Sequence, residues 1–156
     1  MHVSSDRSIA RFRLFLNFSG LSYIILAAPL MVPEFCRNYL AWLCRLNGFL
    51  SLGGEEPVVP SGGVLTLLIN TAGIDFVLIG VFVIYTARNP VARWFIPAVN
   101  ALGRSLFTGV IGHYVIVYDI ARIVLLVGIL DVSISALFLS CLFLLRTSVR
   151  AQDTAR

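Results

Sequence analysis

Four apolar runs, each at least twenty residues long, constrain what this chain of 156 residues can fold into. They cover residues 14–33, 64–87, 94–118 and 123–145. A hydrocarbon core about 30 Å thick needs roughly 20 apolar residues per helix, because each helical residue advances about 1.5 Å. We therefore expect one all-α domain over residues 1–156, an integral membrane four-helix bundle with four transmembrane helices.

The overall composition agrees with a lipid environment. Hydrophobic residues make up 58% of the chain and charged residues 13%, and the mean hydropathy is +0.91. Soluble domains have about 45–50% apolar and about 25% charged residues, so a soluble protein of this length could not bury so much apolar surface. The net charge of +4 comes from arginines near the ends of the apolar runs rather than from a basic stripe. Membrane lipids are the expected partners, and nucleic acid is not.

The arginines also predict an orientation. Eight of them fall on one side of the predicted spans and three on the other, and the positive-inside rule places the richer side in the cytoplasm. Both termini are therefore expected in the cytoplasm, with the chain in the inner membrane. The richer side carries Arg7, Arg11, Arg13, Arg88, Arg93, Arg146, Arg150 and Arg156, and the other side carries Arg37, Arg45 and Arg122.

A cleaved signal peptide is the alternative interpretation of the N-terminal segment. Arginines followed by an apolar run resemble its first two regions. However, the uncharged run at residues 14–33 is longer than the usual 7–15 residues of such a segment. We favour a retained first span.

An additional amphipathic helix is predicted at about residues 34–52. At 100° per residue, its aromatic and leucine side chains collect on one side, and its charged and amide side chains collect on the other. Such a helix lies in the headgroup plane. It could seal the outer mouth of the bundle or act as a lid over a substrate entrance. The apolar side holds Phe35, Tyr39, Trp42, Leu43, Leu46, Phe49 and Leu50, and the polar side holds Glu34, Arg37, Asn38, Ala41, Arg45, Asn47 and Gly48.

The cysteines do not predict a disulfide. Cys36 and Cys44 are eight residues apart, which is about 12 Å along one helix. A disulfide needs Cα atoms within about 7 Å. Cys141 lies in the fourth span, where packing is its expected role.

Each of the last three spans carries one charged residue: Asp75, Arg104 and Asp131. A charge at the bilayer centre costs about 2.5–3.5 kcal/mol, and this cost falls if opposite charges meet. Counted from the outer ends of the helices, the three residues lie about 16, 21 and 12 Å deep, within reach of an arginine side chain. We therefore expect a buried Asp/Arg/Asp cluster.

Small and polar residues share the helix faces of these three charges, since residues three and four apart lie on one face. The cluster could fix the register of three helices, as buried ion pairs can. Alternatively, an acid left over by the single arginine could relay protons or bind a polar ligand. The predicted additional members are Thr71, Asn100, Thr108 and Ser135.

His113 and Asp119 lie near the outer end of the third span. His113 is nine residues from Arg104, about half a turn of the helix away in direction, so the two side chains do not point the same way. An interfacial histidine, with Asp119 or an interfacial group as its partner, is the first interpretation, and an outer gate for protons is the second. No metal-ligand spacing, nucleophile elbow, phosphate-binding glycine loop or CxxC motif occurs, so no metal, cofactor or catalytic residue is predicted.

Three segments resemble a known group of small membrane proteins. These are "GIDFVLIGVFVIYTARNPVAR", "NALGRSLFTGVIGH" and "VGILDVSISALFL", which fall within residues 73–139. They are similar to the DoxX-like and BphX-like four-helix proteins, which share a Gly-x-Asp on the second helix, a short basic inner turn and a Gly-x-x-Asp on the fourth. The resemblance implies a four-helix bundle, linked in some members to quinone-dependent oxidoreductase complexes. It transfers no catalytic residue.

Two functions remain open from the sequence. The first is a membrane protein without catalytic activity of its own, serving as an accessory subunit or as a lipid-phase binding module. The second is a proton-coupled or quinone-handling oxidoreductase or carrier subunit, in which Asp75 and Asp131 exchange protons. Another membrane subunit or a lipophilic small molecule would be the partner.

Overall fold

Helices make up nearly all of the chain that the structure describes. The computed structural model covers residues 2–55 and 62–153, with side chains described at 9–55, 62–144 and 147. The helices are α1 (His2–Ala27), the short 3₁₀ helix η1 (Ala28–Met31), α2 (Pro33–Phe49), α3 (Gly63–Ala87), α4 (Phe95–Tyr118) and α5 (Ile123–Asp153). Four arginines that the topology prediction uses have side chains outside the described part: Arg7, Arg146, Arg150 and Arg156.

The four predicted spans correspond to four long helices. By length and composition, the segments Ile9–Met31, Gly63–Ala87, Phe95–Tyr118 and Ile123–Leu144 are each able to cross a membrane. The first helix, α1, begins at His2, twelve residues before the predicted run, because the segment that carries Arg11 and Arg13 is also helical. It ends where Pro29 opens the 3₁₀ turn, and Pro33 then occupies the first position of α2, where a missing amide hydrogen costs nothing.

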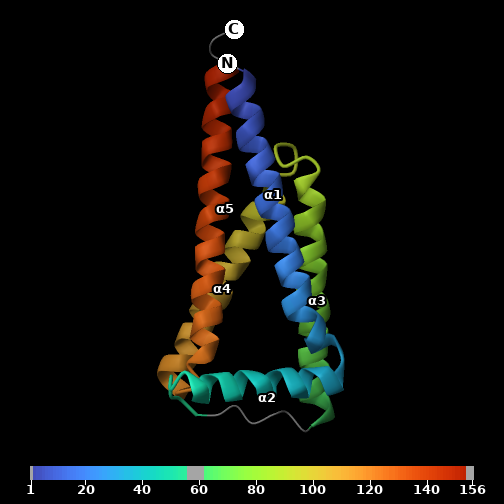
Figure 1. Ribbon diagram of the computed structural model, residues 1–156, viewed down its shortest axis with the longest axis vertical. Helices are drawn as coiled ribbons and strands as arrows, with labels where there is room; N and C mark the ends of the chain where they lie inside the picture. The colour runs from blue at the N-terminus through green and yellow to red at the C-terminus, as the bar shows by residue number, and fades with distance from the viewer. Residues whose placement is uncertain (1, 56–61, 154–156) are drawn as a thin grey trace.

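The long helices form two antiparallel pairs. α1 packs along α3, and α4 packs along α5 (Figure 1). The pairs approach each other near the start of α1 and diverge toward the other end, where α2 lies across them (Figure 1). α2 contacts both α3 and α5, so it bridges the two pairs at the end where they diverge.

Two glycines allow α1 and α3 to touch through their backbones. A Cβ atom added at Gly20 would lie 2.6 Å from the carbonyl oxygen of Gly80, and one added at Gly80 would lie 2.7 Å from the carbonyl oxygen of Gly20. Farther along the same face of α3, a Cβ at Gly73 would lie 2.8 Å from the Cβ of Leu30. Small residues permit such close approach of membrane helices, and here they fix where α1 crosses α3.

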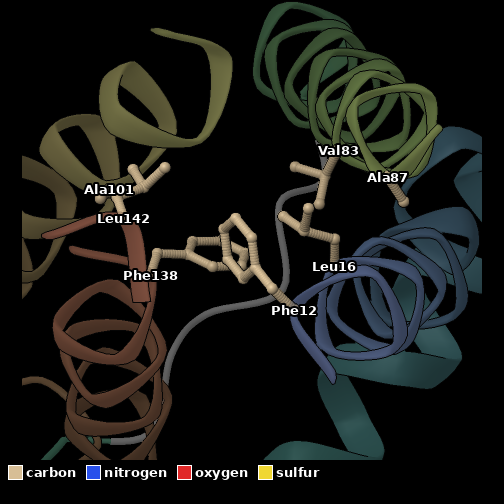
Figure 2. Packing of buried hydrophobic residues seen from close by; sticks show 7 residues of the cluster. All are labelled: Phe12, Leu16, Val83, Ala87, Ala101, Phe138 and Leu142. Carbon is tan, nitrogen blue, oxygen red and sulfur yellow. The ribbon is translucent and has the colours of Figure 1, made fainter. Parts of the chain in front are cut away.

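An apolar core joins the two pairs near the end where they converge. Phe138 of α5 is fully buried, and its ring meets the edges of Phe12 at 6.5 Å and Phe15 at 5.1 Å between centroids. Figure 2 shows the rings of Phe12 and Phe138 side by side between the pairs. All four long helices contribute to this core, which consists of Phe12, Leu16, Val83, Ala87, Ala101, Phe138 and Leu142.

A polar joint closes the opposite end. The side chain of Asn47, at the end of α2, accepts a hydrogen bond from the backbone amide of Ile123 at 3.0 Å and donates one to the carbonyl of Gly53 at 3.2 Å. The amide of Ile123 opens α5 and has no partner within that helix. An isolated parallel bridge joins Glu55 to Ile120, and Gly54 (φ +88°) passes so close to Ile120 that a side chain would not fit.

This joint corrects the prediction for Asn47, which was assigned to the exposed polar side of the amphipathic helix. Asn47 is only 5% exposed because its amide satisfies the start of α5. A helix is present in the predicted range as α2, and its place in the headgroup plane stays a prediction. The side chains that it leaves exposed include three aromatic ones at seven-residue spacing, Phe35, Trp42 and Phe49.

Much of the apolar surface of the long helices is uncovered. At most 22% of the residues in the apolar window of any span are buried within the chain. The accessible surface is 10466 Å², whereas a compact soluble protein of 17.1 kDa has about 7,700 Å². Surface of this kind favours lipid as the surrounding medium.

The backbone contact at Gly20 and Gly80 predicts a specific sensitivity. Gly80→Ala places a methyl group against a carbonyl oxygen, and we expect a loss of about 1–3 kcal/mol of stability from overpacking. Gly103→Ala is the matched control on α4, since nothing lies within 4 Å of a Cβ there, and its better helix propensity should leave stability unchanged or slightly raised. Thermal unfolding of both purified variants in detergent measures the difference. Equal midpoints would contradict the close contact.

Candidate functional site

Arg104 and Asp131 form an ion pair inside the bundle. The Nη1 atom of Arg104 on α4 donates to the Oδ1 atom of Asp131 on α5 at 2.8 Å. The arginine side chain is 2% exposed and the aspartate side chain 15%. This part of the predicted cluster is formed as expected, because the two residues lie on the faces along which α4 and α5 pack.

The first helix completes the surroundings of Arg104, although it carries no charge in its apolar run. The Nη2 atom of Arg104 donates to the hydroxyl of Ser19 at 3.3 Å, and the guanidinium carbon lies 3.8 Å from the centre of the Tyr23 ring. A guanidinium over an aromatic face is attracted by the negative face of the ring. The sequence prediction missed both residues. Their signal was a pair of hydrogen-bonding side chains at i, i+4 within the uncharged run of α1.

Three other predicted members of the cluster lie on α4 and α5 beside the ion pair. Thr108 Oγ1 lies 3.0 Å from the carbonyl oxygens of both Arg104 and Gly128, so it can donate within α4 or across to α5. Ser135 is 2% exposed and donates to the carbonyl of Asp131 on its own helix at 2.8 Å. Asn100 lies one turn from Arg104 on α4.

Two donors at this site have no acceptor within the described residues. They are Nδ2 of Asn100 and Nε of Arg104, both fully buried. A buried donor left without a partner costs about 1–3 kcal/mol. The two residues are one helical turn apart on the same face of α4.

Asp75 does not join the ion pair, which corrects the prediction of a three-membered cluster. It is exposed on α3, and it has no hydrogen bond or ion pair with any described residue. The neighbouring Phe76 takes the inward position, with its ring 6.1 Å from that of Tyr23 and 5.7 Å from that of Phe107. Successive helical residues differ by about 100° in direction, so an inward Phe76 turns Asp75 away. Thr71, also predicted in the cluster, is exposed on α3 and donates to the carbonyl of Leu67 at 2.9 Å.

The predicted outer pair of His113 and Asp119 is not formed either. The ring of the exposed His113 meets the rings of Tyr114 and Tyr118, at 5.9 and 6.2 Å between centroids. Asp119 instead lies 3.7 Å from Arg122. The backbone of Asp119 is left-handed, with φ at +45°, because the chain turns sharply there between α4 and α5.

The remaining chemistry-bearing residues are dispersed. Within the described residues, no three His, Cys, Asp or Glu side chains come together as a metal site would require. Cys36 and Cys44 are not joined by a disulfide, as their spacing predicted. Burial raises the pKa of the Cys36 thiol above its usual value, which lowers its fraction of reactive thiolate.

Known proteins offer no guide to this arrangement. Comparison with protein-family models, with curated proteins and with solved structures finds no match for this chain. The site must therefore be interpreted from its own geometry. In that geometry, Arg104 of α4 is bound by residues of α5 and α1. Its own Nε atom and Nδ2 of Asn100 are donors without an acceptor among the described residues, and Asp75 is exposed on α3.

A double-mutant cycle tests the ion pair. Arg104→Leu or Asp131→Leu alone leaves one buried charge without its partner, and we expect each to cost about 3–5 kcal/mol. The double variant removes both charges and should lose much less than the sum of the two single losses. Thermal unfolding in detergent and the amount of protein in the membrane are the measurements. Additive losses would show that the two side chains do not depend on each other.

Proposed function

We propose that the protein is a four-span integral membrane protein of the inner membrane that acts as a non-catalytic accessory subunit. The observation that carries this proposal is the contrast between its two acids within the spans. Asp131 is bound internally by Arg104, whereas Asp75 is exposed in the middle of α3 without a partner among the described residues. Asp131 and Arg104 stabilise this chain, and Asp75 is left for another molecule.

The internal pair supports a structural role because three helices use one guanidinium. Arg104 contacts Asp131 on α5 and both Ser19 and Tyr23 on α1. Such a junction sets how the α1–α3 pair sits against the α4–α5 pair. A buried ion pair has this positional role in other proteins as well.

The proposed topology places α2 at the outer membrane surface and both termini in the cytoplasm. α2 lies across the ends of the long helices, and its exposed aromatic residues Phe35, Trp42 and Phe49 suit the headgroup region. The turn between α3 and α4 then faces the cytoplasm. There, Arg93 donates to the carbonyl of Tyr85 at 2.8 Å.

The resemblance to the DoxX-like and BphX-like proteins remains part of this proposal. It rests on the three quoted segments, and it fits an accessory role because some members of that group are linked to larger oxidoreductase complexes. We propose no catalytic residue by this route.

The accessory role predicts that the chain is held in a larger assembly. Extracted from its own membranes in mild detergent, the wild-type chain should migrate on a native gel well above the same chain purified alone, whose polypeptide mass is 17.1 kDa. The purified chain in the same detergent is the control for bound lipid and detergent. Identical migration of the two samples would refute the accessory role.

A second candidate function is the binding of a lipophilic molecule with a carbonyl group, such as a quinone. The unpartnered Nδ2 of Asn100 and Nε of Arg104 favour it, because a carbonyl oxygen is the acceptor that both lack. Proton exchange between Asp75 and Asp131 has less support, since Asp131 is engaged by Arg104 and Asp75 points away from it.

This second function predicts stabilisation by such a molecule. An alkyl-tailed benzoquinone at 100 times its Kd should raise the unfolding temperature of the wild type by about 5 °C or more. Asn100→Leu should abolish the shift, because one of the two donors is lost. An alkylbenzene with the same tail controls for partition into the detergent. A shift of the same size with both compounds, or in both proteins, would exclude this site.

A further inference from the structure

We propose that the exposed face of α3 centred on Asp75 docks a transmembrane helix of another protein, and that this helix carries an arginine or lysine near its middle. The inference rests on the proposed accessory function and specifies the chemistry of the partner. It is drawn from the position of Asp75, the surface around it and the distribution of charge in this chain.

The position of Asp75 leaves it no route to water along its own helix. It is the thirteenth of the 25 residues of α3, about 18 Å from either end. Long basic side chains can extend along a helix to reach the headgroups, but a carboxylate on a single methylene cannot. An ionisable side chain this deep in a span ordinarily faces protein or pairs with another charge. Asp75 does neither within the part of the chain that the structure describes.

The surface around Asp75 has the spacing of a helix-packing seam. Exposed residues follow one another at alternating intervals of four and three along α3, and Asp75 stands near the middle of the series. This interval keeps side chains on the stripe that a second, slightly tilted helix contacts. A single polar residue within such a stripe fixes the register of the partner. The series is Val64, Leu68, Thr71, Asp75, Leu78 and Phe82, all exposed.

Charge complementarity decides between the possible occupants. A second copy of this chain would bring another Asp75 to the seam. Beyond Arg11 and Arg13 at the start of the first span, the described spans hold two basic residues: Arg104, which is 2% exposed and bound to Asp131, and His113, which lies only about 8 Å from the end of α4. The copy therefore has no cation to offer at this depth. A helix of another protein with one basic residue at mid-depth would supply the cation that Asp75 lacks.

The test uses the full-length chain in phosphatidylethanolamine–phosphatidylglycerol vesicles and synthetic apolar helices of roughly 20 residues. One peptide carries a central arginine, a second a central glutamate, and a third only leucine and alanine. Energy transfer between labelled chain and labelled peptide reports association. We expect the arginine peptide to bind the wild type about tenfold more tightly than it binds Asp75→Leu. Asp75→Glu should retain the binding, and the other two peptides should not distinguish the variants.

A relocated acid provides the matched control. In the variant Asp75→Leu combined with Leu106→Asp, the carboxylate moves to an exposed position of α4, where Leu106 is 64% exposed. The seam predicts weaker binding of the arginine peptide to this variant than to the wild type. Equal binding would show that any exposed acid suffices and would overturn the assignment to α3.

Two further outcomes would also overturn it. One is equal binding of the arginine peptide to the wild type and Asp75→Leu. The other is energy transfer between wild-type copies that disappears in Asp75→Leu, because it would make a second copy the occupant. Either result can occur while the native chain still migrates in a larger assembly, so the accessory function is judged separately. If the chain migrates alone and yet binds the arginine peptide, the seam is real and the accessory function is wrong.

Discussion

A single guanidinium inside an apolar bundle is the constraint on which the arrangement of the helices depends. Removing a charge from water costs several kcal/mol of solvation free energy, and hydrocarbon provides no interaction that offsets this cost. Arg104 recovers this free energy from a carboxylate on α5, a hydroxyl on α1 and the face of an aromatic ring. Because these groups come from both helix pairs, satisfying the charge also fixes the distance between the pairs.

The apolar contacts then act on either side of this polar layer. Toward the end where the pairs converge, Phe138 fills the space between them, and within the α1–α3 pair the backbones touch at Gly20 and Gly80. Toward the other end the pairs separate, and α2 with its buried Asn47 bridges them. The bundle is therefore tightly packed at one end and joined by hydrogen bonds at the other. The exposure of His113 and Asp119 agrees with the looser packing near the divergent end.

The sequence was sufficient for features that depend on one helix at a time. Run lengths located all four long helices, although α1 begins twelve residues before its predicted run and α5 ends eight residues after its own. Helix periodicity placed Arg104 and Asp131 on facing stripes. Features that depend on the rotation of one helix against another were less accessible. Asp75 and Phe76 are neighbours, and either could have faced inward on periodicity alone. The ring contacts of Phe76 with Tyr23 and Phe107 decide the rotation, and these partners are remote in sequence.

The same limit explains the remaining differences. Ser19 and Tyr23 are neutral, so the charge pattern of the sequence does not predict that they contact a guanidinium. Asn47 belongs to the polar side of α2 by its chemistry, yet it is buried because the open amide of Ile123 lies within reach. His113 and Asp119 are near each other in sequence, but a sharp turn sends Asp119 toward Arg122. In each case the deciding group comes from a different element.

The hydrogen bond between Asn47 and Ile123 has a consequence for biogenesis. A ribosome makes Asn47 before α3 and α4, and the amide that it binds emerges only as α5 begins. Until that moment the side-chain oxygen of Asn47 lacks the amide donor that it binds in the finished protein, and α2 can stay at the membrane surface without closing the bundle. The start of α5 thus completes a joint whose first half was made 76 residues earlier, so assembly of this end waits until α3 and α4 have been synthesised.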